Sequence, residues 1–221
     1  MDAGNETGID LSERSAETRA EAALFRQALL AAILLPLFLM AVYSACAWIT
    51  SFRAVVPTWH FAFEQRITLL PWMIIPYVSF HFAMAIAPMF CSNSDEIAIY
   101  ARRFVFVVMV SGVLLLLLPL HFGIVRPVVT GSFALPLRVL WQLDTNGNLF
   151  PSLHVAVAGV VWPIYVKHAP RALAPIVHIW FTLIVVSTLF TYQHHLIDVI
   201  GGAILAIVAL WLFPSRQRSA Q

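Results

Sequence analysis

The sequence predicts an all-α, polytopic membrane protein, a bundle of six transmembrane helices. Of its 221 residues, 61% are hydrophobic and only 11% are charged, and the mean hydropathy is +0.85. Soluble domains carry about 25% charged residues, so this composition excludes a soluble globular fold. The formal charge of +2 gives no indication of nucleic-acid binding. Cys46 and Cys91 lie within or beside apolar runs, so we expect neither a disulfide nor a metal site.

Apolar stretches define the expected helices, because a hydrocarbon core of about 30 Å takes roughly 20 apolar residues per helix. Six stretches qualify: Ala28–Ile49, Leu69–Phe90, Phe104–Val125, Ser152–Val166, Ala172–Phe190 and Leu196–Phe213. The fourth is short, and we expect it to continue through Lys167 and His168. This division gives a cytoplasmic segment at 1–25, a membrane domain at 26–215 and a cytoplasmic tail at 216–221.

The distribution of Lys and Arg predicts how these helices are oriented. With an even number of spans, both termini share a side, and nine of the 13 basic residues fall on that side. The two sets are Arg14, Arg19, Arg26, Arg102, Arg103, Lys167, Arg171, Arg216 and Arg218, against Arg53, Arg66, Arg126 and Arg138. Cytoplasmic loops carry the excess of Lys and Arg. We therefore expect cytoplasmic termini in an inner or plasma membrane, with the third-to-fourth and fifth-to-sixth connections facing outward.

Two short motifs lie at the outward ends of these spans. Phe150-Pro151-Ser152-Leu153-His154 opens the fourth span, and His194-His195-Leu196-Ile197-Asp198 opens the sixth. Ionisable residues at membrane depth are costly and usually functional. A His in one segment, with a His and an Asp in another, supplies what nucleophilic phosphoryl transfer requires: a nucleophile, its orienting carboxylate and an acid for the leaving group.

The first motif suits a helix start. Pro151 fits the first turn, where its missing N–H would have no partner anyway. The amides of Ser152, Leu153 and His154 would then point outward from a positive helix end and could bind phosphate oxygens, with the Ser152 hydroxyl as a further donor. Helix initiation alone is the structural alternative.

The second motif places His194 and Asp198 four residues apart, so on a helix they share a face. Asp198 could accept a hydrogen bond from one ring nitrogen of His194 and leave the other nitrogen free to attack. A structural ion pair or a capping contact is the alternative. His195 would point about 100° away on a helix, and we take it as an interfacial neighbour and a weaker candidate.

The first motif, followed by Ser187-x6-His194-x3-Asp198 on six spans, resembles the type 2 phosphatidic acid phosphatase superfamily. It looks especially like the branch of inositol phosphorylceramide synthases, which are inositolphosphotransferases with Leu for Gly in Pro-Ser-Gly-His. The resemblance covers roughly 126–202. It implies a phosphohistidine formed on His194, with Asp198 as its orienting partner and His154 as the acid.

The same resemblance implies phosphate binding by Ser152 and by Arg126, which with Pro127 matches the end of the family's first motif, Lys-x6-Arg-Pro. Two expected cations are missing, because Pro119 stands at the Lys position and Thr188 at an Arg position after Ser187. Fewer fixed cations should disfavour a dianionic phosphomonoester relative to a singly charged phosphodiester. Arg138 and His121 are weaker candidates for the phosphate site.

Other polar residues have simpler interpretations. His60 and Glu64, four apart, are too few for a metal site, and we expect them in a solvated amphipathic segment on the membrane surface. His81, His121 and His178 are expected to make interhelical hydrogen bonds. The group Asp144, Asn146 and Asn148 is expected to cap the following helix, and lining a headgroup site is the alternative. Gly201 and Gly202 should let the last helix pack closely against a neighbour.

The sequence therefore predicts a lipid phosphate phosphatase that works through a phosphohistidine and needs no metal or other cofactor. The substrate would be a phospholipid or an isoprenoid phosphate. The first alternative is a lipid phosphotransferase with a second, alcohol substrate such as ceramide. An inactive lipid-binding relative and a small transporter with a proton relay are the remaining alternatives. No nucleic-acid partner is expected.

Overall fold

The structure, a computed structural model, describes residues 6–143 and 147–215, with side chains from residue 14 onward. The described residues form helices and contain no strand, which confirms the all-α prediction. The α-helices are α1 (Glu6–Ser51), α2 (Ile74–Ile86), α3 (Ser94–Leu117), α4 (Ala134–Leu143), α5 (Leu153–His168), α6 (Ala174–Phe190) and α7 (Leu196–Leu212). Short 3-10 helices lie at Ala62–Arg66, Pro71–Met73, Ala87–Phe90 and Arg171–Leu173.

Several helices are long and apolar enough to cross a membrane, so the chain is an integral membrane protein. Within the described residues there are four such segments: Arg14–Ser51, Pro71–Phe90, Ser94–Leu117 and Arg171–Phe190. α7 is apolar but has only 17 residues, and α5 has 16. At 1.5 Å per residue these two helices measure about 25 Å, slightly less than the hydrocarbon core of about 30 Å.

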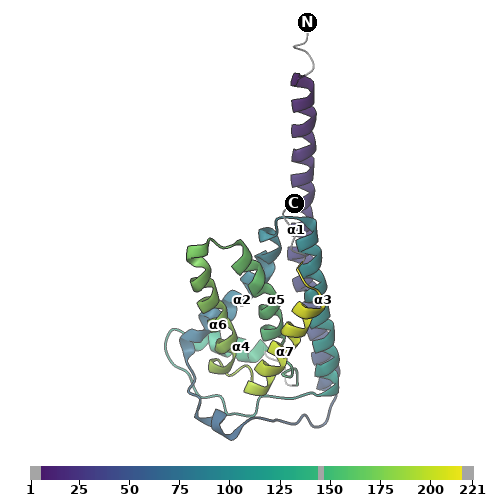
Figure 1. Ribbon diagram of the computed structural model, residues 1–221. Coiled ribbons are helices and arrows are strands. Elements are labelled where there is room, and N and C mark those ends of the chain that lie inside the picture. Colours follow the sequence, from purple (N-terminus) through teal and green to yellow (C-terminus); the bar gives the residue numbers. More distant parts are fainter. Residues whose placement is uncertain (1–5, 144–146, 216–221) are drawn as a thin grey trace.

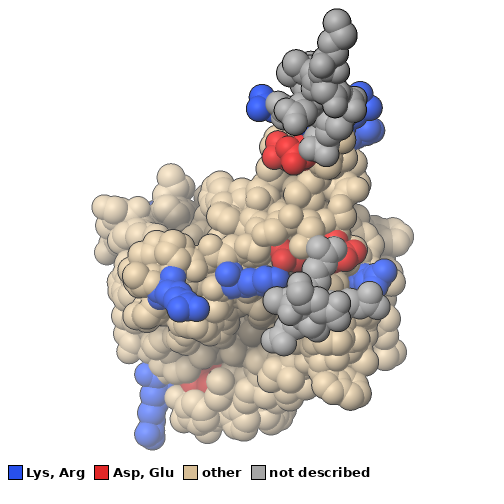
Figure 2. Space-filling view, turned by 45° about the horizontal axis from the view of Figure 1, so that its top comes forward, with Lys and Arg blue, Asp and Glu red and all other residues tan. Residues whose placement is uncertain are grey.

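The long helices run up and down in one bundle, and α4 is short and was not predicted (Figure 1). α1 projects beyond the bundle at one end, where the described chain also finishes. Figure 2, which brings that end forward, shows Lys and Arg side chains on it, while most of the visible surface carries no charge. The connections before α2, between α3 and α5, and between α6 and α7 all lie at the opposite end.

The boundaries of α3 differ from those of the expected span Phe104–Val125. The helix begins at Ser94, ten residues earlier than predicted, and ends at Leu117. Asn93 caps the helix by accepting a hydrogen bond from the Glu96 amide (3.0 Å), so the helix starts before the apolar run. The helix ends at Leu117, because the residue before Pro119 is biased away from helical geometry. Residues 118–125 are therefore a connection, which carries His121.

The centre of the bundle is α5, whose residues Ala156, Val157, Ala158, Val160 and Val161 are completely buried. Small residues bring α7 close to it. A Cβ on Gly202 would lie 2.5 Å from the Ser152 carbonyl oxygen, and one on Gly159 would lie 2.5 Å from the Ala206 Cβ. The expectation of close packing at Gly201 and Gly202 is confirmed, and it fixes the start of α7 against the start of α5.

The polar group before α5 is only partly described. Asp144 and Asn146 lie outside the described residues, as do Arg216 and Arg218 in the segment 216–221. Asn148 does not cap α5, contrary to expectation. Its Nδ2 donates to the Tyr43 carbonyl oxygen of α1 (3.0 Å), and the cap of α5 is Ser152.

Candidate active site

The two motifs meet at the end of the bundle opposite the projecting part of α1. The Ser152 amide donates to the Asp198 carbonyl oxygen over 3.0 Å, which joins the first turns of α5 and α7. Ser152 is fully buried, and its Oγ accepts a hydrogen bond from the Val155 amide (3.3 Å) as the N-cap of α5. The prediction that Pro151 lies in the first turn is wrong, because the helix begins at Leu153 and Pro151 precedes the cap.

This cap leaves two donors at the N-terminus of α5. The Val155 amide is bound to the Ser152 hydroxyl, and the Ala156 amide to the Ser152 carbonyl oxygen (3.0 Å). The amides of Leu153 and His154 belong to the same turn and have no acceptor within the helix. They lie at the positive end of the helix dipole, where anions are stabilised.

The ring of His154 is held by aromatic side chains of α2. Its centroid lies 4.4 Å from that of Tyr77, with the planes 22° apart, and 4.0 Å from that of Phe80. The residue is 7% exposed, and its Nε2 has no hydrogen-bond partner among the described residues. An imidazole with a free nitrogen can act as an acid or base.

His194 lies in the turn between α6 and α7. The prediction that it lies on a helix is therefore wrong. Its amide and that of Gln193 both donate to the Thr188 carbonyl oxygen at the end of α6 (3.1 and 3.0 Å). Tyr192 adopts a left-handed conformation with φ of 57°, which is uncommon for a residue with a side chain. The turn 191–195 is thus a specific structure that presents His194 before α7 begins.

His194 still faces Asp198, although the two do not share a helix face. The His194 Nδ1 lies 3.6 Å from Asp198 Oδ2, longer than a hydrogen bond. The same Oδ2 accepts a hydrogen bond from the His195 amide (2.8 Å). In the described part of the chain, neither His194 Nδ1 nor Asp198 Oδ1 has a hydrogen-bond partner. Catalytic hydrogen bonds are often long without substrate, so this spacing is compatible with an orienting contact.

His195 is buried, with 1% exposure. The expectation that it is an interfacial residue is therefore wrong. Its Nδ1 lies 3.0 Å from Glu64 Oε2, and its Nε2 accepts a hydrogen bond from the Gly123 amide (3.1 Å). Glu64 is only 2% exposed, so the prediction of a solvated amphipathic segment is wrong for this residue. A contact between residues 131 positions apart has no local signal in the sequence.

Arg126 lies against the same turn. Its Nε and Nη2 donate to the Tyr192 carbonyl oxygen (3.2 and 3.0 Å). Its guanidinium also lies over the rings of Phe122 and Trp141, 5.2 and 5.5 Å from their centroids. Arg126, the phosphate ligand that the sequence predicts, is therefore held against Tyr192, two positions before His194 in the chain.

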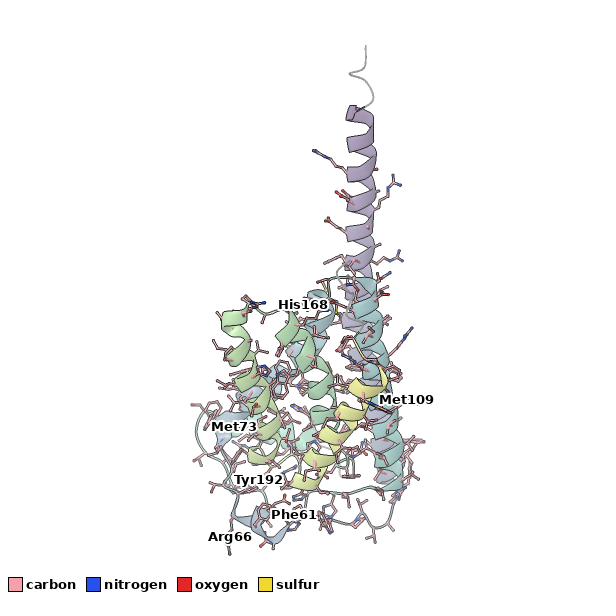
Figure 3. All side chains as sticks on the ribbon, viewed as in Figure 1. Phe61, Arg66, Met73, Met109, His168 and Tyr192 are labelled. Carbon is pink, nitrogen blue, oxygen red and sulfur yellow. The ribbon has the colours of Figure 1, made fainter. Side chains whose placement is uncertain are left out.

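Further residues that support this turn were missed in the sequence. The Tyr77 hydroxyl, whose ring stacks on His154, lies 3.4 Å from Gln193 Oε1. The Trp141 Nε1 of α4 donates to the Thr191 carbonyl oxygen (2.9 Å). The Tyr192 hydroxyl donates to the Ile67 carbonyl oxygen (2.6 Å), and Figure 3 shows Tyr192 with Phe61 and Arg66 at this end, far from His168. Nothing in the local sequence marks Tyr77, Trp141 or Tyr192 as partners of this turn, so only the fold reveals these contacts.

The weaker candidates are placed as follows. The Arg138 side chain is exposed on α4 and donates from Nε to the Ala134 carbonyl oxygen of its own helix (3.3 Å). The His121 Nδ1 lies 2.9 Å from the Phe122 carbonyl oxygen. Thr188, which stands where the family pattern has Arg, is fully buried, and its Oγ1 donates to the Val185 carbonyl oxygen (2.8 Å).

Two spaces lie beside the turn. An open groove of about 500 Å³ runs between residues 65–71 and 127–130, with Tyr192 and Arg66 on its walls. A small cavity of about 10 Å³, close to the size needed for one water molecule, is lined in part by Glu64, His194 and His195. The described residues contain no cluster of three or more His, Cys, Asp and Glu side chains that could hold a metal ion.

Comparison with known proteins identifies the family of this chain. The sequence model of the PAP2 superfamily matches residues 100–220, which is more than half of the 221 residues. This range contains both motifs, Arg126 and the whole of α5, α6 and α7. No curated protein and no solved structure matches the chain. The chain therefore belongs to the PAP2 superfamily, which generally comprises phosphatases and phosphotransferases that act on phosphorylated lipid substrates.

Proposed function

We propose that this protein is a membrane lipid phosphate phosphatase with a phosphohistidine intermediate on His194. The observation that carries the proposal is the hydrogen bond from Ser152 to Asp198, because it fixes the two motifs at one end of the bundle. The proposal is supported by the groups that this end of the bundle then carries: the imidazoles of His154 and His194, the Asp198 carboxylate and the Arg126 guanidinium, which are the groups that phosphoryl transfer through histidine requires.

In the first step, one ring nitrogen of His194 attacks phosphorus, and the bond from phosphorus to the lipid oxygen breaks. His154 in its protonated form gives a proton to that oxygen, so the alcohol leaves neutral. The Asp198 carboxylate, 3.6 Å from Nδ1 of His194, stabilises the positive charge that the ring acquires. In the second step, His154 takes a proton from water, which attacks phosphorus and releases phosphate from His194.

The phosphate oxygens bind to Arg126 and to the amides of Leu153 and His154 at the N-terminus of α5, with Ser152 as a further contact. The proposal is supported by the positive end of the helix dipole at this position. A single fixed donor of this kind typically contributes a factor of about 10² to 10³ in rate.

We also propose that α1, α2, α3, α5, α6 and α7 are six spans, with cytoplasmic termini and the site at the outer face. Alternation of these helices in the bundle (Figure 1) supports this arrangement. The lipid tail would then reach the site laterally from the outer leaflet. The short lengths of α5 and α7 are compatible with local thinning of the bilayer.

A second candidate is a phosphotransferase that passes the phosphoryl-containing group from His194 to an alcohol such as ceramide. The observation that favours it is the loss of two cations: position 119 is Pro, and Thr188 is buried with its hydroxyl bound to its own helix. A site with fewer cations favours a singly charged phosphodiester donor over a dianionic monoester.

One lipid-class screen tests both candidates. The purified protein is assayed on phosphatidic acid, on an isoprenyl diphosphate, and on phosphatidylinositol with ceramide, and both free phosphate and transferred headgroup are measured. Free phosphate that depends on His194 supports the phosphatase, and a His194-dependent transfer product supports the phosphotransferase. Activity on none of the three donors would contradict the proposed function.

A further inference from the structure

We infer that Glu64 and His195 are positioning residues: a buried carboxylate–imidazole pair that holds the nucleophile His194 in its reactive place. The inference rests on the proposed function, because it concerns the reactivity of His194. We call the two side chains the Glu64–His195 pair. They come from segments 131 residues apart, and neither is assigned a catalytic step.

The pair joins three connections at the site end of the bundle. Glu64 belongs to the connection between α1 and α2, and its Oε1 accepts a hydrogen bond from the Phe61 amide (2.8 Å). Its Oε2 accepts one from the Leu196 amide at the first residue of α7 (3.0 Å) and contacts His195 Nδ1. The Nε2 of His195 accepts a hydrogen bond from Gly123, in the connection after α3. Fixing this ring therefore fixes all three segments at once.

These partners define the tautomer of His195. A backbone amide can only donate, so Nε2, which faces Gly123, carries no proton and Nδ1 carries it. The Glu64 carboxylate then accepts from three donors: the Phe61 amide, the Leu196 amide and His195 Nδ1. Burial also lowers the pKa of the His195 ring against the opposing effect of Glu64. Both carboxylate oxygens and both ring nitrogens of the pair therefore have hydrogen-bond partners.

Stacking prevents the His195 ring from rotating. The Phe122 ring stacks on the His195 ring with centroids 4.4 Å apart and planes at 7°, and the His60 ring stacks on it with centroids 4.9 Å apart and planes at 19°. Hydrogen bonds fix the two ring nitrogens, and these contacts fix the plane. The His195 ring is thus held both by its nitrogens and by its plane.

The constraint is transmitted directly to the candidate nucleophile and its carboxylate. His194 is the preceding residue, and the His195 amide donates to Asp198 Oδ2 (2.8 Å), the oxygen nearest His194 Nδ1. The small cavity between Glu64, His194 and His195 leaves about one water molecule of free space. A displacement of the His195 ring would therefore move both His194 and Asp198.

Three substitutions separate the contacts of the pair. Glu64→Gln keeps the acceptor for Phe61 but turns an NH₂ group toward two donors, His195 Nδ1 and the Leu196 amide. His195→Asn keeps a donor near the Nδ1 position and loses the acceptor for Gly123. His195→Gln keeps an acceptor near Nε2 and loses the donor to Glu64. The matched controls are Glu17→Gln on α1 and His178→Gln on α6, both at exposed positions.

Each variant of the full chain is purified and assayed on phosphatidic acid, an isoprenyl diphosphate, and phosphatidylinositol with ceramide, and kcat and KM are compared on the donor that the wild type turns over fastest. A misplacement of about 1 Å costs on the order of 10²-fold in rate. We expect Glu64→Gln to lower kcat by about that factor with KM nearly unchanged. His195→Asn and His195→Gln should retain more activity than a fourth variant, His195→Ala, which removes both ring contacts. The two controls should match the wild type.

Amide hydrogen exchange of α5 and α6 establishes that each variant is folded. Folded Glu64→Gln and His195→Ala proteins with wild-type kcat would overturn the inference, because the pair would then be structural only. In that case His194→Ala would still be inactive and the proposed function would stand. If Glu64→Gln fails to fold, folded His195→Asn and His195→Gln proteins take its place. A lowered kcat in them supports the inference, and a wild-type kcat in both overturns it. A wild-type protein inactive on all three donors would overturn the proposed function and this inference together.

Discussion

The amide of Ser152 lies 3.0 Å from the carbonyl oxygen of Asp198, and this hydrogen bond joins the starts of α5 and α7. Its position explains why the two helices need small residues at their contact. Gly202 is directly opposite Ser152, and Gly159 is opposite Ala206 further along the same interface. Close approach of the helices and assembly of the site are therefore one structural requirement.

Gly202→Ala should disturb the close contact between the starts of α5 and α7, and with it the site. The new methyl group would lie 2.5 Å from the Ser152 carbonyl oxygen, so one helix must move. Overpacking of this kind costs about 1–3 kcal/mol, and we expect a fall in kcat besides the loss of stability. Thermal unfolding in detergent and steady-state kinetics measure the two effects.

Gly159→Ala is the matched control, since its methyl group meets the Ala206 side chain away from the motifs. It should lower stability by a similar amount and affect kcat less. Equal loss of kcat in both variants would show that the contact at Ser152 has no special importance.

Asp198→Asn should keep the local fold and impair the chemistry. An Asn oxygen can still accept the hydrogen bond from the His195 amide, but the neutral amide cannot stabilise a positive charge on His194. Positioned acid–base groups contribute factors of about 10² to 10⁴ in rate, and we expect a loss of kcat in that range. Single-turnover rates of phosphoenzyme formation give the direct measurement; a variant with an unchanged rate would remove Asp198 from the mechanism.

Folding stability should decrease as the pH falls below about 6.5, the ordinary pKa of histidine. Burial lowers the pKa of His195 in the folded protein, even with Glu64 and Asp198 nearby and with His60 acting in the same direction as burial. The unfolded chain therefore takes up a proton first, and the stability present above pH 6.5 is lost as the pH falls toward the lower folded pKa. Denaturation midpoints between pH 7.5 and pH 5 test this, and His195→Gln should flatten the dependence. An equally steep dependence in that variant would assign it to other groups.

Cys91 should react slowly with thiol reagents in the folded protein. Burial raises the pKa of its thiol to about 11, and only the thiolate is nucleophilic. Maleimide labelling at pH 7 in mild detergent should be slow and should become fast in denaturant. A Cys46→Ser variant isolates the signal of Cys91, and rapid labelling of that folded variant would contradict the buried position.

The sequence was sufficient for the parts of the fold that depend on local patterns. Apolar runs indicated α1, α2, α5, α6 and α7, and the start of α7 at Leu196 agrees with the prediction. α3 was misplaced because the run of apolar residues does not reveal that Asn93 caps the helix earlier. A cap is one hydrogen bond, and it decides a boundary that hydropathy leaves open.

The site was predictable only in part for a similar reason. Motif spacing indicated His154, His194 and Asp198, and the fold brings their segments together. The partners of His195 could not be found this way, since Glu64 reaches it from a connection that looked like a surface segment. Tyr77 and Trp141 were equally hidden, because an aromatic side chain near a span end has the same sequence signal whether it faces lipid or a neighbouring turn.

Trapping of the covalent intermediate tests the central claim most directly. The purified chain is mixed with a lipid donor radiolabelled in phosphorus, quenched in alkali and separated under denaturing conditions. We expect a labelled protein band that is lost in acid and is absent from His194→Ala. A His194→Ala protein that still forms this acid-labile band, or that turns over the donor at the wild-type rate, would contradict the account.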